Sequence, residues 1–177
     1  MNKRNKDGTF NKDYLKELWE TNPPIERGVD FEKFESMTPE AVYLLGFIWA
    51  DGYVKKHKDD GKKRGHIIQL SIAEEGYLDI KHIFDAVGHW YTWNKGKKKK
   101  AHHKQIVLIR TKNKFLHQFL VECDFCDKSI VGADKILEKI PNELHYLFYR
   151  GLFDGDGCWH IGENHRSCTF AGHSQHD

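Results

Sequence analysis

The sequence repeats one short stretch, first as Leu44-Leu45-Gly46-Phe47-Ile48-Trp49-Ala50-Asp51-Gly52 and again as Tyr149-Arg150-Gly151-Leu152-Phe153-Asp154-Gly155-Asp156-Gly157. Both copies are typical of the last turns of a helix that ends at a glycine. Gly46 and Ala50 are four positions apart, as are Gly151 and Gly155, so each pair shares one helix face. Glycine inside a helix costs roughly 1 kcal/mol relative to alanine, and close approach of two helix backbones explains its presence. We therefore expect the two helices to pack through these residues, with Asp51 and Asp156 side by side.

Two neighbouring carboxylates at helix C-termini are electrostatically unfavourable. Each faces the negative end of its helix dipole, and repulsion between the two raises the pKa of one of them. A divalent cation between them removes both effects, and Mg²⁺ is commonly held by one or two carboxylates with water and phosphate. Asp-Gly is also a common turn signal, but the matched glycines and apolar positions favour a metal site. The sequence thus predicts Mg²⁺, or another divalent cation, at Asp51 and Asp156.

The chain between the two copies alternates helical and strand patterns. Thr38 followed by Pro39 is a helix start, which predicts the first motif helix at 39–51. Period-two alternation then predicts hairpins at 53–73 and 90–110, with helices at 74–87, 112–122, 131–139 and 142–156. A last hairpin is expected from Cys158–Ile161 and Cys168–Gly172. The fold class is therefore α+β, with the element order αββαββα.

Both motif copies resemble the paired LAGLIDADG motifs of the homing endonucleases. Thr38 to Tyr43, which precede the first copy, and Lys128-Ser129 with Ile140-Pro141, which precede the second, are similar to the family as well. Trp49 and Tyr149-Arg150 depart from the family pattern without changing its glycines or its last aspartate. The resemblance covers residues 31–172. It implies an αββαββα repeat with helices backing an antiparallel DNA-binding sheet.

The resemblance divides the chain into three parts. Residues 1–30 form a polar arm with a short helix, 31–141 the first repeat, and 142–177 the beginning of a second, truncated repeat. We expect the truncated chain to self-associate or to require a missing C-terminal half, because the absent segments would leave apolar surface exposed.

Both hairpin loops are strongly basic. The cationic residues in or beside them are Lys55, Lys56, Lys58, Lys62, Lys63, Arg64, Lys95, Lys97, Lys98, Lys99, Lys100 and Lys104. Lysine-rich hairpin tips can also serve only to prevent strand aggregation. Two such loops beside a paired-carboxylate site favour double-stranded DNA, since each neutralised phosphate adds sequence-independent affinity. Gln69, Ser71 and Arg110 are the expected base-reading residues, although a one-residue shift in register would turn them inward.

The four cysteines give little support to a zinc site. Cys123 and Cys126 are two residues apart, but Cys158 and Cys168 do not form a second close pair. The first residues contain no apolar signal region, and the apolar run Ala41–Ala50 is too short to span a bilayer. We therefore expect an intracellular protein without a membrane partner.

The resemblance implies a site-specific, metal-dependent DNA endonuclease of the kind that supports intron or intein mobility. Such an enzyme would cut both strands across the minor groove and leave short 3′ overhangs. Lys128, or a lysine of one of the basic loops, is the candidate that would offset charge in the transition state; the resemblance implies a basic residue near the site without specifying which one. Two alternatives stay open: a non-catalytic DNA- or RNA-binding protein, such as a maturase or regulator, and an inactive endonuclease fragment. Retention of both motif aspartates favours the enzyme, because a pure binder gains nothing from a repulsive pair.

Overall fold

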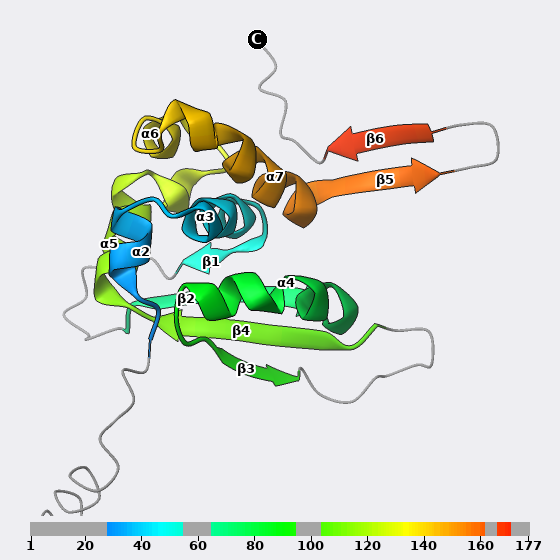
Figure 1. The fold of residues 1–177 in the computed structure, drawn as a ribbon, viewed down its shortest axis with the longest axis horizontal. Coiled ribbons are helices and arrows are strands. Elements are labelled where there is room, and N and C mark those ends of the chain that lie inside the picture. Colours follow the sequence, from blue (N-terminus) through cyan, green and yellow to red (C-terminus); the bar gives the residue numbers. More distant parts are fainter. Residues whose placement is uncertain (1–27, 55–64, 95–103, 162–165, 171–177) are drawn as a thin grey trace, which may run out of the picture.

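The computed structural model describes residues 28–54, 65–94, 104–161 and 166–170, and Figure 1 shows their arrangement. The elements are α2 (Phe31–Glu35), α3 (Pro39–Asp51), β1 (Tyr53–Val54), β2 (Ile67–Ala73), α4 (Glu74–Ala86), β3 (Tyr91–Asn94), β4 (Ile106–Lys112), α5 (Lys114–Glu122), the 3₁₀ turn η1 (Phe125–Asp127), α6 (Asp134–Leu137), the 3₁₀ turn η2 (Asn142–Leu144), α7 (His145–Asp156), β5 (Gly157–Ile161) and β6 (Arg166–Phe170). The α+β class and the αββαββα order from α3 to α5 are confirmed. The expected arm lies almost wholly outside the described residues.

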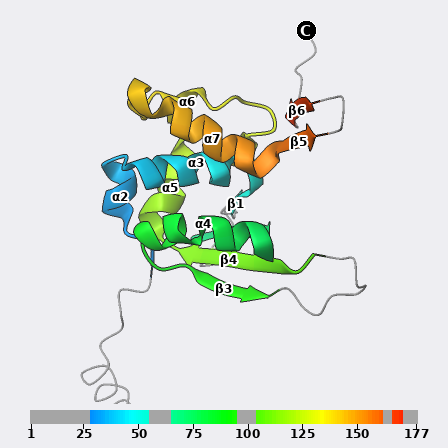
Figure 2. The ribbon, with the colours of Figure 1, turned by 45° about the vertical axis from the view of Figure 1, so that its right-hand side comes forward.

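Four strands form one antiparallel sheet in the order β1-β2-β4-β3. Its two central strands alternate in burial: Ile68, Leu70 and Ile72 of β2 are buried, and so are Val107 and Ile109 of β4. Such alternation is typical of a sheet with one face on a core and one face in solvent. Figures 1 and 2 show α4 against the buried face, and no described helix covers the opposite one, which we call the outer face.

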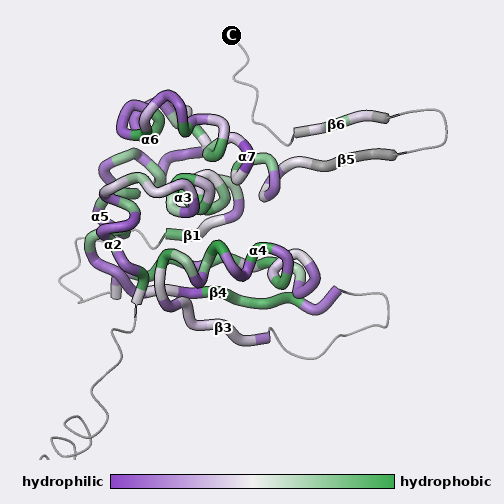
Figure 3. Tube along the Cα trace, in the orientation of Figure 1, coloured by the Kyte–Doolittle hydropathy of each residue, from purple (hydrophilic) through white to green (hydrophobic). Residues whose placement is uncertain are grey.

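Helix α3 lies at the centre of the molecule. Every residue from Ala41 to Trp49 is buried, and Figures 1 and 2 show α3 between α7 and the layer formed by α4 and the sheet. Figure 3 shows hydrophobic stretches in α3, α4 and β4, the elements that lie around this centre. A helix that is apolar on all sides requires such a position.

The start and end of α3 follow from local chemistry. The Thr38 hydroxyl accepts a hydrogen bond from the Ala41 amide, and Pro39 occupies the first turn. At the other end, the Gly52 amide donates to the Ile48 carbonyl at 2.7 Å, and the chain then becomes extended. The predicted bounds of this helix are confirmed.

All four helices predicted after the first are shorter in the structure, those expected at 74–87 and 112–122 by one and two residues. The helix expected at 131–139 is reduced to α6. The backbone amides of Ile130 and Val131 both donate hydrogen bonds to the Asp127 carbonyl, so the chain forms a turn where the helix was expected to begin. The helix expected at 142–156 begins at His145 after the η2 turn. There, the His145 ring nitrogen Nε2 contacts the carbonyls of Leu137 and Ile140, so the ring fills the junction between α6 and α7.

The predicted hairpin after α7 is confirmed as β5 and β6, which pair antiparallel in a separate two-stranded sheet. It extends away from the body of the molecule in Figure 1. Within the described part of the chain, no helix is long and apolar enough to cross a membrane.

Candidate functional site

Helices α3 and α7 make backbone contact at two glycines. A Cβ atom on Gly46 would lie 1.9 Å from the Phe148 carbonyl oxygen, and a Cβ atom on Gly151 would lie 2.0 Å from the Tyr43 carbonyl oxygen. Any side chain at either position would therefore overlap the backbone of the other helix. The structure thus places both motif glycines where the two helices cross.

The remaining pair of small residues lies one turn further along. A Cβ atom on Gly155 would lie 2.4 Å from the Cβ of Ala50, so the helices stay close up to their C-terminal turns. Across the same interface, the Tyr43 hydroxyl donates a 2.8 Å hydrogen bond to Oδ2 of Asp154. Burial and this hydrogen bond raise the pKa of Tyr43, so the hydroxyl keeps its proton and the bond.

This packing brings the C-terminal ends of both helices together. Asp51 is the last residue of α3 and Asp156 the last of α7. The pKa of Asp51 is raised, first by burial and then by the charge of Asp156, while the charge of Lys128 acts in the opposite direction. Asp51, Asp156 and Lys128 therefore form one electrostatic cluster, built from three segments of the chain.

Lys128 lies at the C-terminal end of α3. Its ammonium group donates hydrogen bonds to the carbonyl oxygens of Trp49, Ala50 and Gly52. It also lies 4.8 Å from the centre of the Phe125 ring. Burial lowers the pKa of Lys128. A cation at this position satisfies carbonyls that a helix end leaves without partners and opposes the helix dipole.

The departure from the family pattern at Trp49 has a packing explanation. The Trp49 ring lies edge-on to Phe125 at 5.5 Å and tilted against Phe148 at 6.4 Å. It is therefore part of the core that joins α3, η1 and α7, and the motif's only carboxylate in this copy is Asp51.

The cluster has the donor set of a hard divalent cation. Carboxylate oxygens, water and phosphate are the ligands that Mg²⁺ prefers, and two carboxylates converge here beside the ammonium group of Lys128. Among the described residues, no group of three or more His, Cys, Asp and Glu side chains is placed to hold a metal. The site therefore fits an ion that keeps several ligands from water or substrate.

The outer face of the sheet carries all three expected base-reading residues. Gln69 and Ser71 of β2 alternate with its buried residues, and so does Arg110 of β4. Sequence reasoning missed the aromatic side chains beside them. Tyr53 pairs with Gln69, Tyr91 with Arg110, and Trp93 with Leu108, so all three are on this face. The spacing of Tyr91 and Trp93, two positions apart, is the sequence signal that would have placed both on one face of β3, although burial does not alternate along this strand and all four of its residues are exposed.

Most of the expected phosphate-binding residues lie outside the described part of the chain. This holds for Lys55, Lys56, Lys58, Lys62, Lys63, Arg64, Lys95, Lys97, Lys98, Lys99 and Lys100. Lys104 is described; it is exposed, and its ammonium lies 3.9 Å from a Glu75 carboxylate oxygen.

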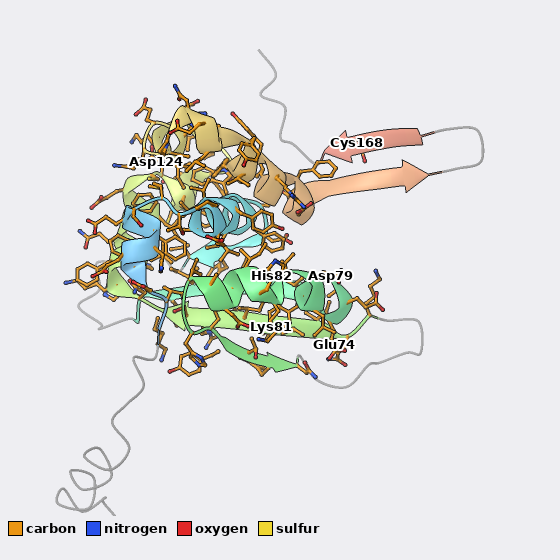
Figure 4. All side chains as sticks on the ribbon, in the orientation of Figure 1. Glu74, Asp79, Lys81, His82, Asp124 and Cys168 are labelled. Atoms are coloured by element: carbon orange, nitrogen blue, oxygen red, sulfur yellow. The ribbon has the colours of Figure 1, made fainter. Side chains whose placement is uncertain are left out.

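Two further features lie away from the carboxylate pair. A cavity of about 650 Å³ opens between α3, α4 and α7, lined in part by Tyr43, Phe47 and Asp154. Its rim on α4 includes Asp79 and His82, which Figure 4 labels. Cys123 is buried, and burial raises the pKa of its thiol to about 11, which disfavours the thiolate that zinc requires.

Comparison with known proteins shows similarity in structure only. No family model matches the sequence, and no curated protein matches it. One similar solved structure is a doubly substituted I-DmoI in complex with its nicked target DNA in the presence of manganese, with 16% identity, a TM-score of 0.46, and coverage of 68% of this chain and 62% of that one. Another is the LAGLIDADG meganuclease I-AabMI bound to uncleaved DNA, with 13% identity, a TM-score of 0.43, and coverage of 74% and 64%. The match spans less than two thirds of either protein.

Proposed function

We propose that this chain is a DNA endonuclease similar to the LAGLIDADG homing enzymes, with Asp51 and Asp156 holding a divalent cation. The observation that carries the proposal is the close crossing of α3 and α7. The crossing at Gly46 and Gly151 brings two carboxylates into electrostatic contact at one end of both helices. The two carboxylates share the charge of one neighbouring ammonium, Lys128, so a bound divalent cation would offset the repulsion that remains between them.

The residues of the chain have distinct roles in this proposal. Asp51 and Asp156 would hold Mg²⁺ or a similar ion through their carboxylate oxygens. When bound, such an ion would supply the Lewis acidity that phosphodiester hydrolysis needs at the attacking water and at the leaving 3′ oxygen. Lys128 orients the C-terminal turn of α3 through its three carbonyl contacts. It therefore positions Asp51, and its charge reaches both carboxylates.

The outer face of the sheet is the proposed DNA surface. It is not covered by a described helix, and it combines Arg110 with exposed Tyr53, Tyr91 and Trp93. The major groove admits a two-stranded β-ribbon, which the two central strands β2 and β4 would supply, and the basic loops would supply phosphate contacts. We therefore propose double-stranded DNA as the partner.

Cation binding can be tested without a cleavage assay. Thermal unfolding of the wild-type chain should shift upward in Mn²⁺ or Mg²⁺ relative to EDTA, because an ion that binds only the folded state stabilises it. Asp51→Asn and Asp156→Asn should each abolish the shift, whereas Asp79→Asn, on the exposed side of α4, should retain it. An equal shift in all four proteins would exclude the carboxylate pair as the site.

Cleavage requires a target, which selection can provide. Duplexes that bind in EDTA are selected from a random library and then incubated with Mg²⁺. Cleavage by the wild type, with none by Asp51→Asn or Asp156→Asn despite nearly unchanged binding, is the expected result. Binding without cleavage in the wild type would instead indicate a non-catalytic DNA-binding protein.

A further inference from the structure

One row of side chains crosses the outer face through all four strands. The paired residues are Tyr53 of β1, Gln69 of β2, Arg110 of β4 and Tyr91 of β3. Gln69 and Arg110 occupy the two central strands of the sheet, and the tyrosines occupy the edges. Four strands span about 14 Å at the usual spacing, close to the width of about 12 Å of the major groove. The central pair would therefore face base edges, and the edge strands would face the phosphates.

Arg110 is held in one orientation. Its Nε and Nη2 atoms both donate to Oε1 of Gln69, at 3.1 and 2.5 Å. Its guanidinium also lies 4.9 Å from the centre of the Trp93 ring. Both Arg110 and Gln69 are half-buried. An arginine side chain normally loses rotamer entropy when a ligand orders it. Here the contacts with Gln69 and Trp93 order Arg110 before any ligand binds.

The pairing changes what Gln69 can recognise. A free glutamine recognises adenine with one donor and one acceptor, at N7 and N6. Guanidinium has no acceptor, so the oxygen of Gln69 must face Arg110 and cannot also face a base. Among the described residues, neither side chain has another hydrogen-bond partner. The pair as a whole therefore presents only N–H donors to solvent.

We propose that Arg110 recognises guanine in the major groove and that Gln69 is its positioning residue and not an adenine reader. Guanine presents two acceptors, O6 and N7, whereas adenine presents an acceptor beside a donor. A donor-only pair therefore matches guanine and leaves one mismatched contact with adenine. This inference rests on the proposed binding of DNA at the outer face.

The test is selection of bound duplexes from a random library in EDTA, followed by affinity measurements on single-base variants of the selected site. The wild type should require guanine at one position, with a loss of about 5- to 100-fold for adenine there. Arg110→Ala frees the Gln69 amide, so the preferred base at that position should change from guanine to adenine. Gln69→Leu should weaken the guanine preference without creating another.

Two more variants separate base recognition from charge and from folding. Arg110→Lys keeps the charge but loses the rigid fork of donors that Gln69 orients, so it should weaken the guanine preference while the salt dependence of binding stays unchanged. Lys112→Ala, at the exposed end of the same strand, should retain the preference. Thermal unfolding of each variant identifies any loss of structure.

The outcomes are distinguishable. If the wild type binds no duplex, the proposed DNA-binding function fails and the inference fails with it. If the wild type binds DNA and Arg110→Ala weakens all sequences equally, with the log–log salt slope lowered by about 0.9, Arg110 contacts a phosphate. That result would overturn the inference and leave the proposed function intact.

Discussion

Two features of Asp51 disfavour its charged form and so reduce the stability of the fold. Asp51 ends a buried helix, where the dipole is negative, and its pKa is raised by burial and by Asp156. Residues placed for function often reduce stability in this way, because the chemistry requires charges that folding does not favour. The same residue should therefore show opposite effects in assays of stability and of cleavage.

We expect Asp51→Asn to stabilise the cation-free fold at neutral pH. A carboxyl whose pKa is raised on folding contributes stability below its unfolded pKa and loses that contribution as the pH rises through its folded pKa. Stability curves of wild type and variant in EDTA should thus be close near pH 4 and differ by about 0.5 kcal/mol at pH 7, since solvent screening limits the gain. Asp79→Asn is the control. A gap that narrows as the pH rises would contradict the prediction.

Lys128 should matter for stability as well as for function. Lys128→Met leaves the last carbonyls of α3 without their donor, so we expect a loss of about 1–3 kcal/mol in the free energy of unfolding. Urea denaturation measures it. Lys112→Met, at an exposed strand end, should change stability by less than about 0.5 kcal/mol. If Lys128 acted only on the substrate phosphate, both variants would unfold alike.

At the scale of elements, the crossing of α3 and α7 determines the site. Gly46 and Gly151 allow the two helix backbones to touch. That contact fixes the positions of the residues between the crossing and the C-terminal ends of both helices. Because both helices end within two turns of it, a small change in their separation would move Asp51 relative to Asp156.

Gly46→Ala and Gly151→Ala should therefore each lower stability by about 3 kcal/mol or more, because the new methyl overlaps a carbonyl of the facing helix. Gly76→Ala is the matched control. It lies within α4, and its added Cβ meets nothing nearer than a side-chain atom of Ile72 at 3.8 Å. That change should stabilise the protein by about 0.5–1 kcal/mol. Similar effects at all three glycines would exclude the close crossing.

Across the molecule, most of the cationic residues lie in segments other than the sheet surface proposed to contact the bases. The sheet presents a mixed aromatic and polar face, whereas most cationic residues of the hairpins belong to the loops at its ends. A net charge of +2 gives weak general attraction, so binding to DNA should depend on where the charges lie.

Replacing Lys97, Lys98, Lys99 and Lys100 with alanine should weaken binding to all duplexes about equally. Each lost phosphate contact should lower the slope of log Kd against log salt by roughly 0.9. Titrations between 50 and 200 mM salt measure the slope. An unchanged slope in the quadruple variant would show that this loop has no phosphate contact, and a changed base preference would show a different role for it.

Local sequence signals predicted the order of the helices and strands and the bounds of α3. Thr38 and Pro39 begin α3, Gly52 ends it, and the alternation in β2 and β4 identified the two faces of the sheet. These signals are local, because capping and periodicity act within a few residues. The repeated glycines also predicted the helix crossing, since a glycine inside a helix needs a packing explanation.

Contacts between residues far apart in the sequence became visible only in the folded chain. Lys128 contacts carbonyls 76–79 positions away, and Arg110 contacts Gln69 across 41 positions. No local pattern specifies such pairs, because they depend on the packing of η1 on α3 and on the register of β2 with β4. The shortened α6 has the same origin, since backbone turns after η1 replaced the helical hydrogen bonds that the propensity of 131–139 predicted. Strand register and helix packing depend on the whole chain. They therefore determine which side chains surround the two motif aspartates and which lie beside Arg110, neither of which the motifs specify.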